Sequence, residues 1–233
     1  MSGVGATFQR LSRLNLNPAS FVNLGAGRGD DSPFYLSHWP DMKILLVDMD
    51  TRFVPGYESM QADGANVCFE IAAAGPADGK SNFKKTNDVG GVLDSSATDG
   101  DTNVYTVDTL VKMHELAPPY FLKFDTHGVE VDILKGCQET LQNTVLIQME
   151  MYNFDLKFAD GKSLRFHNMF AHLEELGFRC VDIVDPLYRP GDEALWQFHG
   201  ILIRSDHSVF DYSGYSSGKL SLEELERKRT GSS

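Results

Sequence analysis

The chain has 233 residues, of which 42% are hydrophobic and 23% are charged, a composition typical of one globular domain rather than of a disordered chain. Its 33 acidic and 21 basic residues give a net charge of −12, so the surface repels a phosphate backbone on average, and we expect no nucleic-acid partner unless a local basic patch exists. No apolar run approaches the roughly 18 residues of a membrane span and Met1–Arg13 holds no signal-peptide core, so we expect a soluble, cytoplasmic protein without a membrane partner.

Segments with strand and helix character alternate along the chain, which predicts an α/β fold with a mostly parallel sheet. The first strands are expected at three short apolar runs, at residues 21–24, 43–47 and 66–72. Between them we expect a helix at residues 30–39 with Pro33 in its first turn, capped by Asp30, Asp31 or Ser32. A second helix is expected at residues 51–60, interrupted at Pro55 and Gly56.

Residues 75–103 are rich in glycine, aspartate, serine and threonine and show little apolar periodicity. They predict a long loop, with a hairpin left open because residues 81–84 have strand character. Loops of this length in compact domains often act as lids or binding loops.

The second half of the chain continues the alternation. Strands are expected at residues 120–124, 144–149, 178–184 and 196–203. Helices are expected at residues 128–142, at 163–176 with Ser163 as the cap, and at 220–229 in a polar tail. We therefore divide the chain into an N-terminal extension (1–20), one domain (21–205) and a C-terminal tail (206–233). Three cysteines, odd in number and far apart, predict reduced thiols and neither a disulfide framework nor a zinc site.

Three glycines, Gly25, Gly27 and Gly29, follow the first expected strand and precede a helix. Such a turn needs residues without side chains, because the backbone bends sharply and a ligand approaches the free N–H groups of the helix start. Asp48 ends the next strand, 23 positions after Gly25, where a carboxylate can accept both hydrogen bonds from a ribose diol. Together these residues predict a nucleoside site.

The sixth position of the glycine turn distinguishes between nucleotide ligands. A dinucleotide fingerprint has a small residue there, whereas this chain has Asp30, which would repel a pyrophosphate. The pattern suits a nucleoside joined to a zwitterionic amino acid, S-adenosylmethionine. Two alternatives stay open: a nicotinamide-dependent oxidoreductase, which the absence of a convincing Tyr-x-x-x-Lys pair disfavours, and a nucleoside-binding protein without catalysis.

A second motif, KFDTHGVE at residues 123–130, stands where a strand gives way to a helix. Asp125, His127 and the later Glu150 all fall at expected carboxyl ends of strands, where ligands bind in open α/β sheets. Their types permit a divalent cation, but their spacing does not establish one, and no metal site is expected. Structural roles also stay open: Asp125 as a helix cap, His127 as a solvated side chain, and a Lys123–Glu130 ion pair.

The run KFDTHGVEVDILKG resembles the KxDxxGxE motif of the FkbM family of methyltransferases. Further similar segments are VYTVDTL at residues 104–110, Glu150 in IQMEM, LGFR at residues 176–179 and the last strand at 196–204. The resemblance covers residues 21–204. Three positions depart from the family pattern: Asn23 in place of an acid, Met49 in place of a proline, and His199 in place of an aspartate.

The resemblance implies a Rossmann-like class I methyltransferase with a seven-stranded, mostly parallel sheet whose last strand is antiparallel. It also implies S-adenosylmethionine as methyl donor, with Asp48 on the ribose hydroxyls and the glycines beside the methionine and ribose. The residues expected at the cofactor are Asn23, Gly25, Ala26, Gly27, Gly29, Asp48, Met49 and Asp125. The usual acceptor in the family is a hydroxyl, often on a sugar or natural product.

Methyl transfer is an in-line displacement for which the protein mainly supplies alignment, and a hydroxyl acceptor also gains from a general base. We expect His127 as that base, because histidine side chains titrate nearest neutrality, and Asp125 as the second candidate. His199 is expected to be a hydrogen-bonded residue in or beside the last strand. The acceptor, a small molecule or a glycan, is expected to contact Thr126, Glu150, Tyr152 and Trp196. A homodimer is left open.

Overall fold

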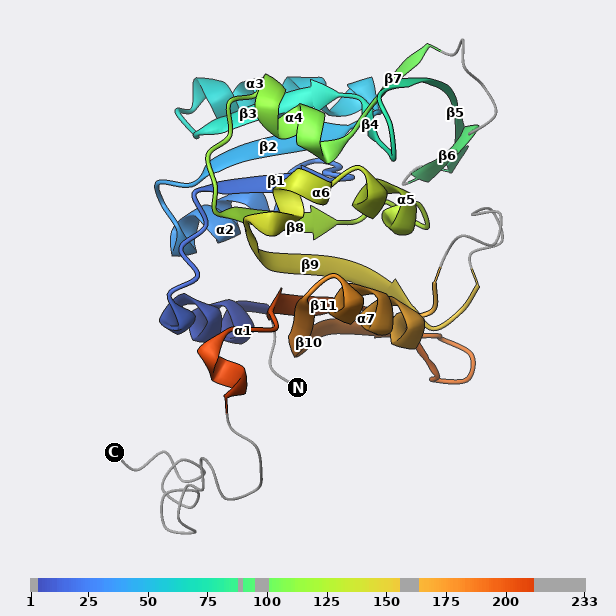
Figure 1. Ribbon diagram of the computed structural model, residues 1–233. Coiled ribbons are helices and arrows are strands. Elements are labelled where there is room, and N and C mark those ends of the chain that lie inside the picture. The colour runs from blue at the N-terminus through green and yellow to red at the C-terminus, as the bar shows by residue number, and fades with distance from the viewer. Residues whose placement is uncertain (1–3, 88–89, 95–100, 156–163, 212–233) are drawn as a thin grey trace.

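The computed structural model of the protein describes residues 4–87, 90–94, 101–155 and 164–211. A seven-stranded sheet forms its centre, in the order β10-β11-β9-β8-β1-β2-β3 (Figure 1). Its strands all run parallel except β11, which is antiparallel to both of its neighbours. This arrangement confirms the expected fold class. The strands are β1 (Ser20–Leu24), β2 (Lys43–Asp48), β3 (Val67–Ile71), β8 (Tyr120–Phe124), β9 (Thr144–Tyr152), β10 (Phe178–Tyr188) and β11 (Leu195–Arg204).

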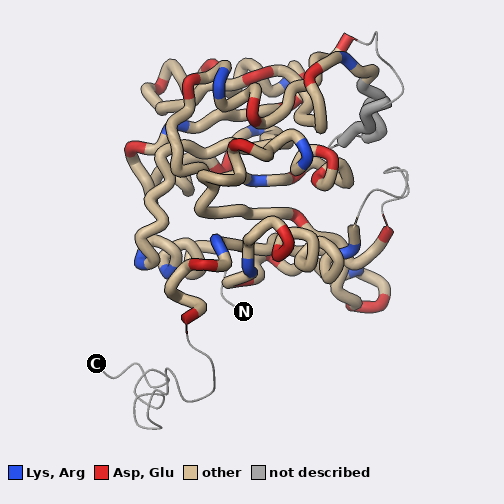
Figure 2. The backbone as a smooth tube through the Cα atoms, in the orientation of Figure 1, with Lys and Arg blue, Asp and Glu red and all other residues tan. Residues whose placement is uncertain are grey.

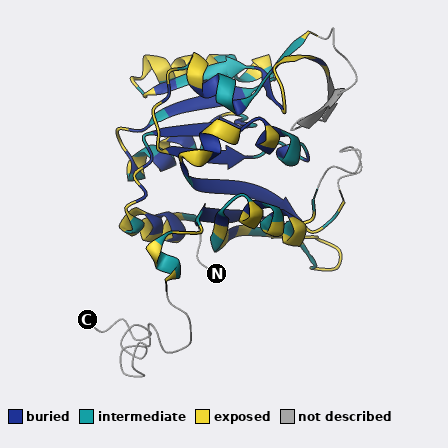
Figure 3. Ribbon diagram, in the orientation of Figure 1, coloured by how far each residue is buried: buried dark blue, intermediate teal, exposed yellow. Residues whose placement is uncertain are grey.

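Helices cover both faces of this sheet, which is why its central strands β1 and β8 are buried at every position. On one side, Phe21 and Phe121 pack against α1 (Val4–Leu11), α2 (Ser32–His38) and α3 (Val54–Ala62). On the other, Val22 and Leu122 pack against α4 (Val107–Met113), α5 (Glu130–Lys135), α6 (Gln138–Gln142) and α7 (Phe166–Glu175). Figure 3 shows the result, with buried strands between partly exposed helices. Short 3₁₀ turns, η1 (Ser12–Leu14), η2 (Thr51–Phe53) and η3 (Ser208–Phe210), complete the elements.

The segment before residue 20 contributes to the core. Phe8 of α1 is fully buried, with its ring 5.2 Å from that of Tyr35 and 6.0 Å from that of Phe121. The division of the chain at residue 20 stays a prediction.

A second, four-stranded sheet lies where a long loop was expected. Its order is β4 (Ala73–Ala74), β7 (Thr102–Tyr105), β5 (Gly79–Asn87) and β6 (Gly90–Asp94). The strand character expected at residues 81–84 is confirmed, because they lie in β5, which pairs antiparallel with β6. The loop expectation is wrong for the described part of residues 75–103, because backbone pairing with β7 stabilises strands that composition alone disfavours.

Three expected helices differ in their bounds or their capping. The helix at 128–142 divides at Gly136 and Cys137 into α5 and α6. Pro55 lies in the first turn of α3 and does not interrupt it, since proline is tolerated there. Pro33 does lie in the first turn of α2, but the preceding Asp31 makes no capping hydrogen bond.

Strand β9 continues past residue 149 to Tyr152, so Glu150 lies inside the strand and not after it. The expected cap Ser163 and the expected helix at residues 220–229 lie outside the described residues.

The three cysteines carry free thiols. Among the described helices, none combines the length and apolar content that a bilayer crossing requires. Basic residues are dispersed among acidic ones over the view in Figure 2.

Candidate functional site

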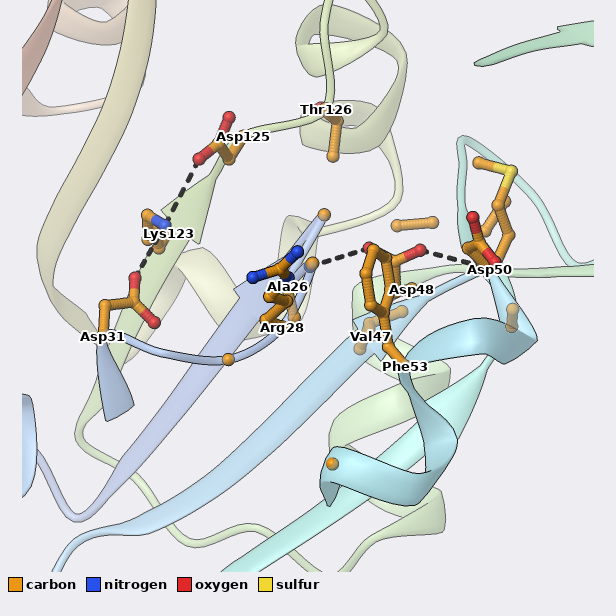
Figure 4. A pocket seen from close by; sticks show the side chains of 18 of the residues that line it. Ala26, Arg28, Asp31, Val47, Asp48, Asp50, Phe53, Lys123, Asp125 and Thr126 are labelled. Atoms are coloured by element: carbon orange, nitrogen blue, oxygen red, sulfur yellow. Dashed lines mark hydrogen bonds and ion pairs between the residues drawn. The ribbon is translucent and has the colours of Figure 1, made fainter. Parts of the chain in front are cut away.

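A cavity of about 1250 Å³ opens at the carboxyl ends of β1, β2 and β8. It exceeds the roughly 300–1,000 Å³ of typical small-molecule pockets, so it has room for two ligands side by side. The glycine turn, Asp48 and the 123–130 motif all contribute to it, and Figure 4 shows how their side chains face it. Of the site residues expected from the sequence, those that line this cavity are Gly25, Ala26, Gly27, Gly29, Asp48, Met49, Asp125, Thr126 and His127.

The glycine turn brings the end of β1 close to the ends of β2 and β8. The N–H groups of Gly25 and Ala26 both donate to the carbonyl of Val47 on β2. Gly25 and Gly27 have φ of +75° and +54°, a left-handed conformation that favours glycine. A Cβ at Gly25 would lie 2.1 Å from the carbonyl oxygen of Asp125, whereas a Cβ at Gly27 would meet no atom within 4 Å. Gly25 is therefore required by packing, and Gly27 leaves open space beside the cavity.

The Asp48 carboxylate is fixed by two backbone groups. Its Oδ2 accepts from the N–H of Gly27 at 2.8 Å and its Oδ1 from the N–H of Asp50 at 2.9 Å. Burial raises the pKa of Asp48. A carboxylate has about four acceptor positions, so each oxygen keeps one for a further donor. The geometry therefore fits the pair of ribose hydroxyls expected at this residue.

The cavity is acidic. Five aspartates line it, against two arginines and one lysine: Asp30, Asp31, Asp48, Asp50 and Asp125, with Arg28, Arg52 and Lys123. An excess of negative charge in a partly enclosed site favours a cationic ligand and disfavours a pyrophosphate. The residues present thus fit a sulfonium-bearing nucleoside better than a dinucleotide.

Lys123 of β8 lies beneath the cavity between two carboxylates (Figure 4). Its Nζ is 2.7 Å from Asp31 Oδ2 and 3.3 Å from Asp125 Oδ2. Burial lowers the pKa of Lys123, but the two carboxylates outweigh burial and raise it overall. Asp31 also accepts from Asn23 Nδ2 at 3.2 Å, and Asn23 is fully buried and outside the lining. Asn23, expected at the cofactor, therefore supports Asp31 and does not line the cavity, and the alternative of a Lys123–Glu130 pair is wrong.

His127 occupies a turn that another residue holds in place. Its φ is +54°, unusual for a residue with a side chain, and Gly128 follows at +105°. Both carboxylate oxygens of Glu130 accept from the N–H of Gly128, at 2.9 and 3.0 Å. Asp125 is therefore not a cap of α5, which begins at Glu130 without a side-chain capping bond, and Glu130 instead binds the N–H just before that helix. The turn directs the His127 ring towards Glu150, with Nε2 3.3 Å from Glu150 Oε2 and 3.9 Å from Asp125 Oδ1.

Glu150 is buried, and each of its carboxylate oxygens accepts one hydrogen bond. Its Oε2 accepts from the hydroxyl of Tyr152 and its Oε1 from Nε2 of Gln197, both at 2.6 Å. Burial, followed by the nearby Asp125 carboxylate, raises the pKa of Glu150 to about 7. Glu150 and Tyr152 are therefore placed beside the cavity, behind His127.

His199 lies opposite Glu150 in the register of β11 with β9, which confirms its expected place in the last strand. The expected hydrogen bond is wrong, because neither ring nitrogen has a hydrogen-bond partner in the described part of the chain, although Nδ1 lies 3.9 Å from Asp185 Oδ2. Burial lowers the pKa of His199.

Asp125, His127 and Glu150 each bring one donor atom within 4.8 Å of the others. These types suit a divalent cation. However, Lys123 already compensates the charge of Asp125, and both oxygens of Glu150 already accept hydrogen bonds. The contacts within the protein therefore satisfy the cluster without a cation.

Two residues of the site were not predicted from the sequence, and one predicted residue lies elsewhere. Gln197 was missed because it pairs with Glu150 across 47 positions and no local pattern marks it. Arg28 lies within the glycine turn, so its place in the lining could have been inferred from the motif. Trp196 is not among the lining residues and instead contacts Phe154, with ring centroids 5.7 Å apart.

Comparison with protein families matches residues 10–180 to the methyltransferase FkbM domain. This match confirms the resemblance drawn from the 123–136 motif. A comparison with curated proteins found no match.

Solved structures share the fold at low identity. A Klebsiella pneumoniae protein assigned provisionally as an O-methyltransferase is 12% identical, with a TM-score of 0.50 over 86% of this chain and 79% of that one. A 1,6-didemethyltoxoflavin-N1-methyltransferase of Burkholderia thailandensis, solved with S-adenosylhomocysteine, is 14% identical, with a TM-score of 0.46 over 87% and 80%. EvdMO1 is 16% identical, with a TM-score of 0.47 over 86% of this chain, which spans 40% of the length of EvdMO1.

Proposed function

The chain belongs to the FkbM methyltransferase family, and from that premise we propose that it methylates a hydroxyl oxygen of a small molecule or sugar. S-adenosylmethionine is the cofactor, and when bound it supplies a methyl group on a positively charged sulfur. The observation that carries the proposal is the acidic cavity that Asp48 and His127 both line. A nucleoside bound at Asp48 and an acceptor bound at His127 would share this one cavity.

Asp48 binds the ribose in this proposal, with one free acceptor position on each oxygen. The open space at Gly27 admits the nucleoside close to the backbone, and the neighbouring residues Ala26 and Met49 also line the cavity. Asp125 and the other lining aspartates attract the sulfonium charge. The same aspartates disfavour the pyrophosphate of a nicotinamide cofactor.

His127 is the proposed general base. It lines the cavity, and its side chain is 39% exposed, so it reaches the acceptor directly. Asp125 is a poorer base: burial raises its pKa, but Lys123 and the two nearby histidines outweigh burial and lower it overall. Thr126 lines the cavity beside His127 and is the proposed contact to the acceptor. A base in this position contributes on the order of 10²–10⁴-fold to the rate.

Titration calorimetry tests the cofactor site. We expect the protein to bind S-adenosylmethionine and S-adenosylhomocysteine and to leave NAD unbound. Asp48→Asn should weaken S-adenosylhomocysteine binding at least tenfold, because a hydrogen bond to a charged group contributes roughly 1.5–3 kcal/mol. Asp41→Asn, an exposed aspartate outside the cavity, is the matched control and should bind like the wild type. Unchanged affinity in a folded Asp48→Asn protein would contradict the assignment.

Methyl transfer itself is tested with S-adenosylmethionine carrying a ¹³C-methyl group and mixtures of hydroxyl-bearing metabolites and oligosaccharides. Mass spectrometry should find a product heavier by one labelled methyl group, and fragmentation should place it on oxygen. Cofactor binding with transfer to nitrogen or carbon would contradict the hydroxyl acceptor. Binding without any transfer would favour a nucleoside-binding protein that lacks catalysis.

A further inference from the structure

We propose that Glu150 is a positioning residue, which holds the Nε2–H of His127 so that the opposite ring nitrogen, Nδ1, takes the proton of the acceptor. The inference deepens the proposed function and rests on it for the role of His127 as a base. It replaces the expectation that Glu150 contacts the substrate. Three features of the structure support it: the fixation of Glu150, the orientation of His127, and the difference in their exposure.

Two strands fix the Glu150 carboxylate from either side. Tyr152 lies two positions further along β9, so its side chain is on the same face, and Gln197 is the register partner of Tyr152 on β11. Each donates one hydrogen bond of 2.6 Å, one to each carboxylate oxygen. A carboxylate held in this way has little freedom to turn towards a substrate, and it presents one oxygen, Oε2, to His127.

The turn at 125–128 brings the His127 ring to that oxygen. The left-handed conformation of His127 is maintained by Glu130, which binds the next N–H. Strain of this kind persists only where the surrounding contacts impose it, and it is concentrated at functional sites. The ring therefore has a defined orientation towards Glu150, with Nε2 at 3.3 Å.

The chemistry of the two groups then determines the tautomer. When Glu150 is ionised, its carboxylate only accepts hydrogen bonds, so in that state the ring nitrogen that faces it carries the proton. A neutral imidazole has one N–H, which leaves a lone pair on Nδ1. Within the described part of the chain, the carboxylate contacts of His127 are both made by Nε2, at 3.3 Å from Glu150 and 3.9 Å from Asp125, and Nδ1 makes no hydrogen bond, so Nδ1 is free to accept a proton.

Exposure separates the two roles. The side chain of His127 is 39% exposed and lines the cavity, whereas that of Glu150 is 5% exposed and is absent from the lining. The acceptor can thus reach the imidazole but not the carboxylate. As its oxygen forms the new C–O bond, the C–S bond of the sulfonium breaks to leave a thioether, and the hydroxyl proton passes to Nδ1. Glu150 stabilises the resulting imidazolium, which releases its proton to solvent.

A divalent cation at the same three residues is the competing arrangement, and it makes the opposite demand on His127. A cation between Asp125, His127 and Glu150 would need the lone pair on Nε2, which moves the proton to Nδ1. The tautomer of one histidine therefore distinguishes the two arrangements. The charge of Lys123 beside Asp125 favours the arrangement without the cation.

Nitrogen NMR of the full chain with ¹⁵N-labelled histidine tests the proposal without any acceptor. His127→Gln identifies the His127 signals by their loss. We expect protonated Nε2, unprotonated Nδ1, and a downfield Nε2–H resonance protected from exchange with water. Glu150→Gln should speed the exchange of that proton at least tenfold. Gln197→Leu, which frees one carboxylate oxygen while leaving Glu150 in place, should speed it by a smaller factor.

The matched control is Glu70→Gln. Glu70 faces His114 with an N–O distance of 3.1 Å, so it repeats the acid–histidine pair away from the cavity. This variant should leave the His127 signals unchanged. A proton on Nδ1 in the wild type, or an exchange rate unaffected by Glu150→Gln, would overturn the proposal. Selective broadening of the His127 signals by Mn²⁺ would also overturn it, in favour of the cation.

Kinetics supply a second readout once an acceptor is identified. Glu150→Gln should lower kcat by about 10²–10⁴-fold, the contribution of a general base, with little change in the KM of the acceptor. A residue that binds substrate would instead raise KM. Failure of S-adenosylhomocysteine to bind in calorimetry contradicts the proposed function, whereas failure of the NMR test with intact binding contradicts only the role of Glu150.

Discussion

At Gly25 there is no room for a side chain. The carbonyl of Asp125 lies 2.1 Å from the position that a Cβ would take, so the strand ends of β1 and β8 approach as closely as their backbones allow. This approach brings the glycine turn and the 123–130 motif into one cavity. Gly27, two positions later, has the same left-handed conformation but open space around it.

The two glycines should therefore respond differently to alanine. Gly27→Ala should cost about 1–2 kcal/mol, the strain of a left-handed residue with a side chain. Gly25→Ala should cost roughly 1–3 kcal/mol more, because the backbone of Asp125 must also move. Urea unfolding of both variants measures the difference. Equal losses would show that the contact with Asp125 does not constrain the turn.

At the scale of single elements, helix α1 contributes to the core in a way that its composition does not indicate. The ring of Phe8 lies against Tyr35, Trp39 and Phe121, and the residue is 0% exposed. This helix closes the sheet face opposite α4 and α5. Its packing connects the N-terminal segment to the strands that carry the site.

Removal of this ring should destabilise the whole domain. Phe8→Ala should lower the free energy of unfolding by about 3–5 kcal/mol, the usual cost of deleting a buried aromatic side chain. Gln9→Ala, exposed on the same helix, should change it by less than about 0.5 kcal/mol. Chemical denaturation followed by circular dichroism measures both. A loss at Phe8 no larger than that at Gln9 would mean that α1 detaches without affecting the core.

Helix α6 shows why one expected helix became two. Its first N–H groups, those of Glu139 and Thr140, donate to the carboxylate of Asp108 on α4, at 3.0 and 2.7 Å. Because a side chain of another helix accepts hydrogen bonds from these free N–H groups, α6 needs no capping residue in its own sequence. Residues 128–142 do show apolar periodicity, but this pattern does not indicate that the helix is interrupted at Gly136.

At the scale of the whole molecule, charge decides which partners approach. The net charge is −12, and the cavity itself carries more acidic than basic residues. Basic residues are dispersed and not gathered over the view in Figure 2. Such a surface disfavours the binding of polyanions on average, which supports the proposed small acceptor over a nucleic acid.

A fluorescent RNA oligonucleotide tests this repulsion. We expect no saturable binding below about 100 μM at physiological salt, since even non-specific binders reach 10⁻⁴–10⁻⁶ M through basic contacts. Fluorescence anisotropy across a salt series is the measurement. An affinity that rises steeply as salt is lowered would reveal a basic patch and would reopen a nucleic-acid acceptor.

The sequence by itself determined the local features of this protein. Apolar runs mark the buried strands, glycine marks the turn because other residues resist its backbone angles, and the 123–130 motif indicates the family. These features depend on neighbours within a few positions, so pattern and spacing are enough to find them. The alternative pairing of Lys123 with Glu130 is wrong because it assumed that neighbours in sequence are also partners in space.

Only the tertiary structure decided which distant groups meet. Lys123 contacts Asp31 at the start of α2, Gln197 reaches Glu150 through the register of β11 with β9, and Asp108 of α4 binds N–H groups in the first turn of α6. Strand order and helix packing determine these contacts, and at Gln197 a register difference of one position would send the side chain to the other face of the sheet. A local pattern contains neither order nor register, so it cannot predict such contacts.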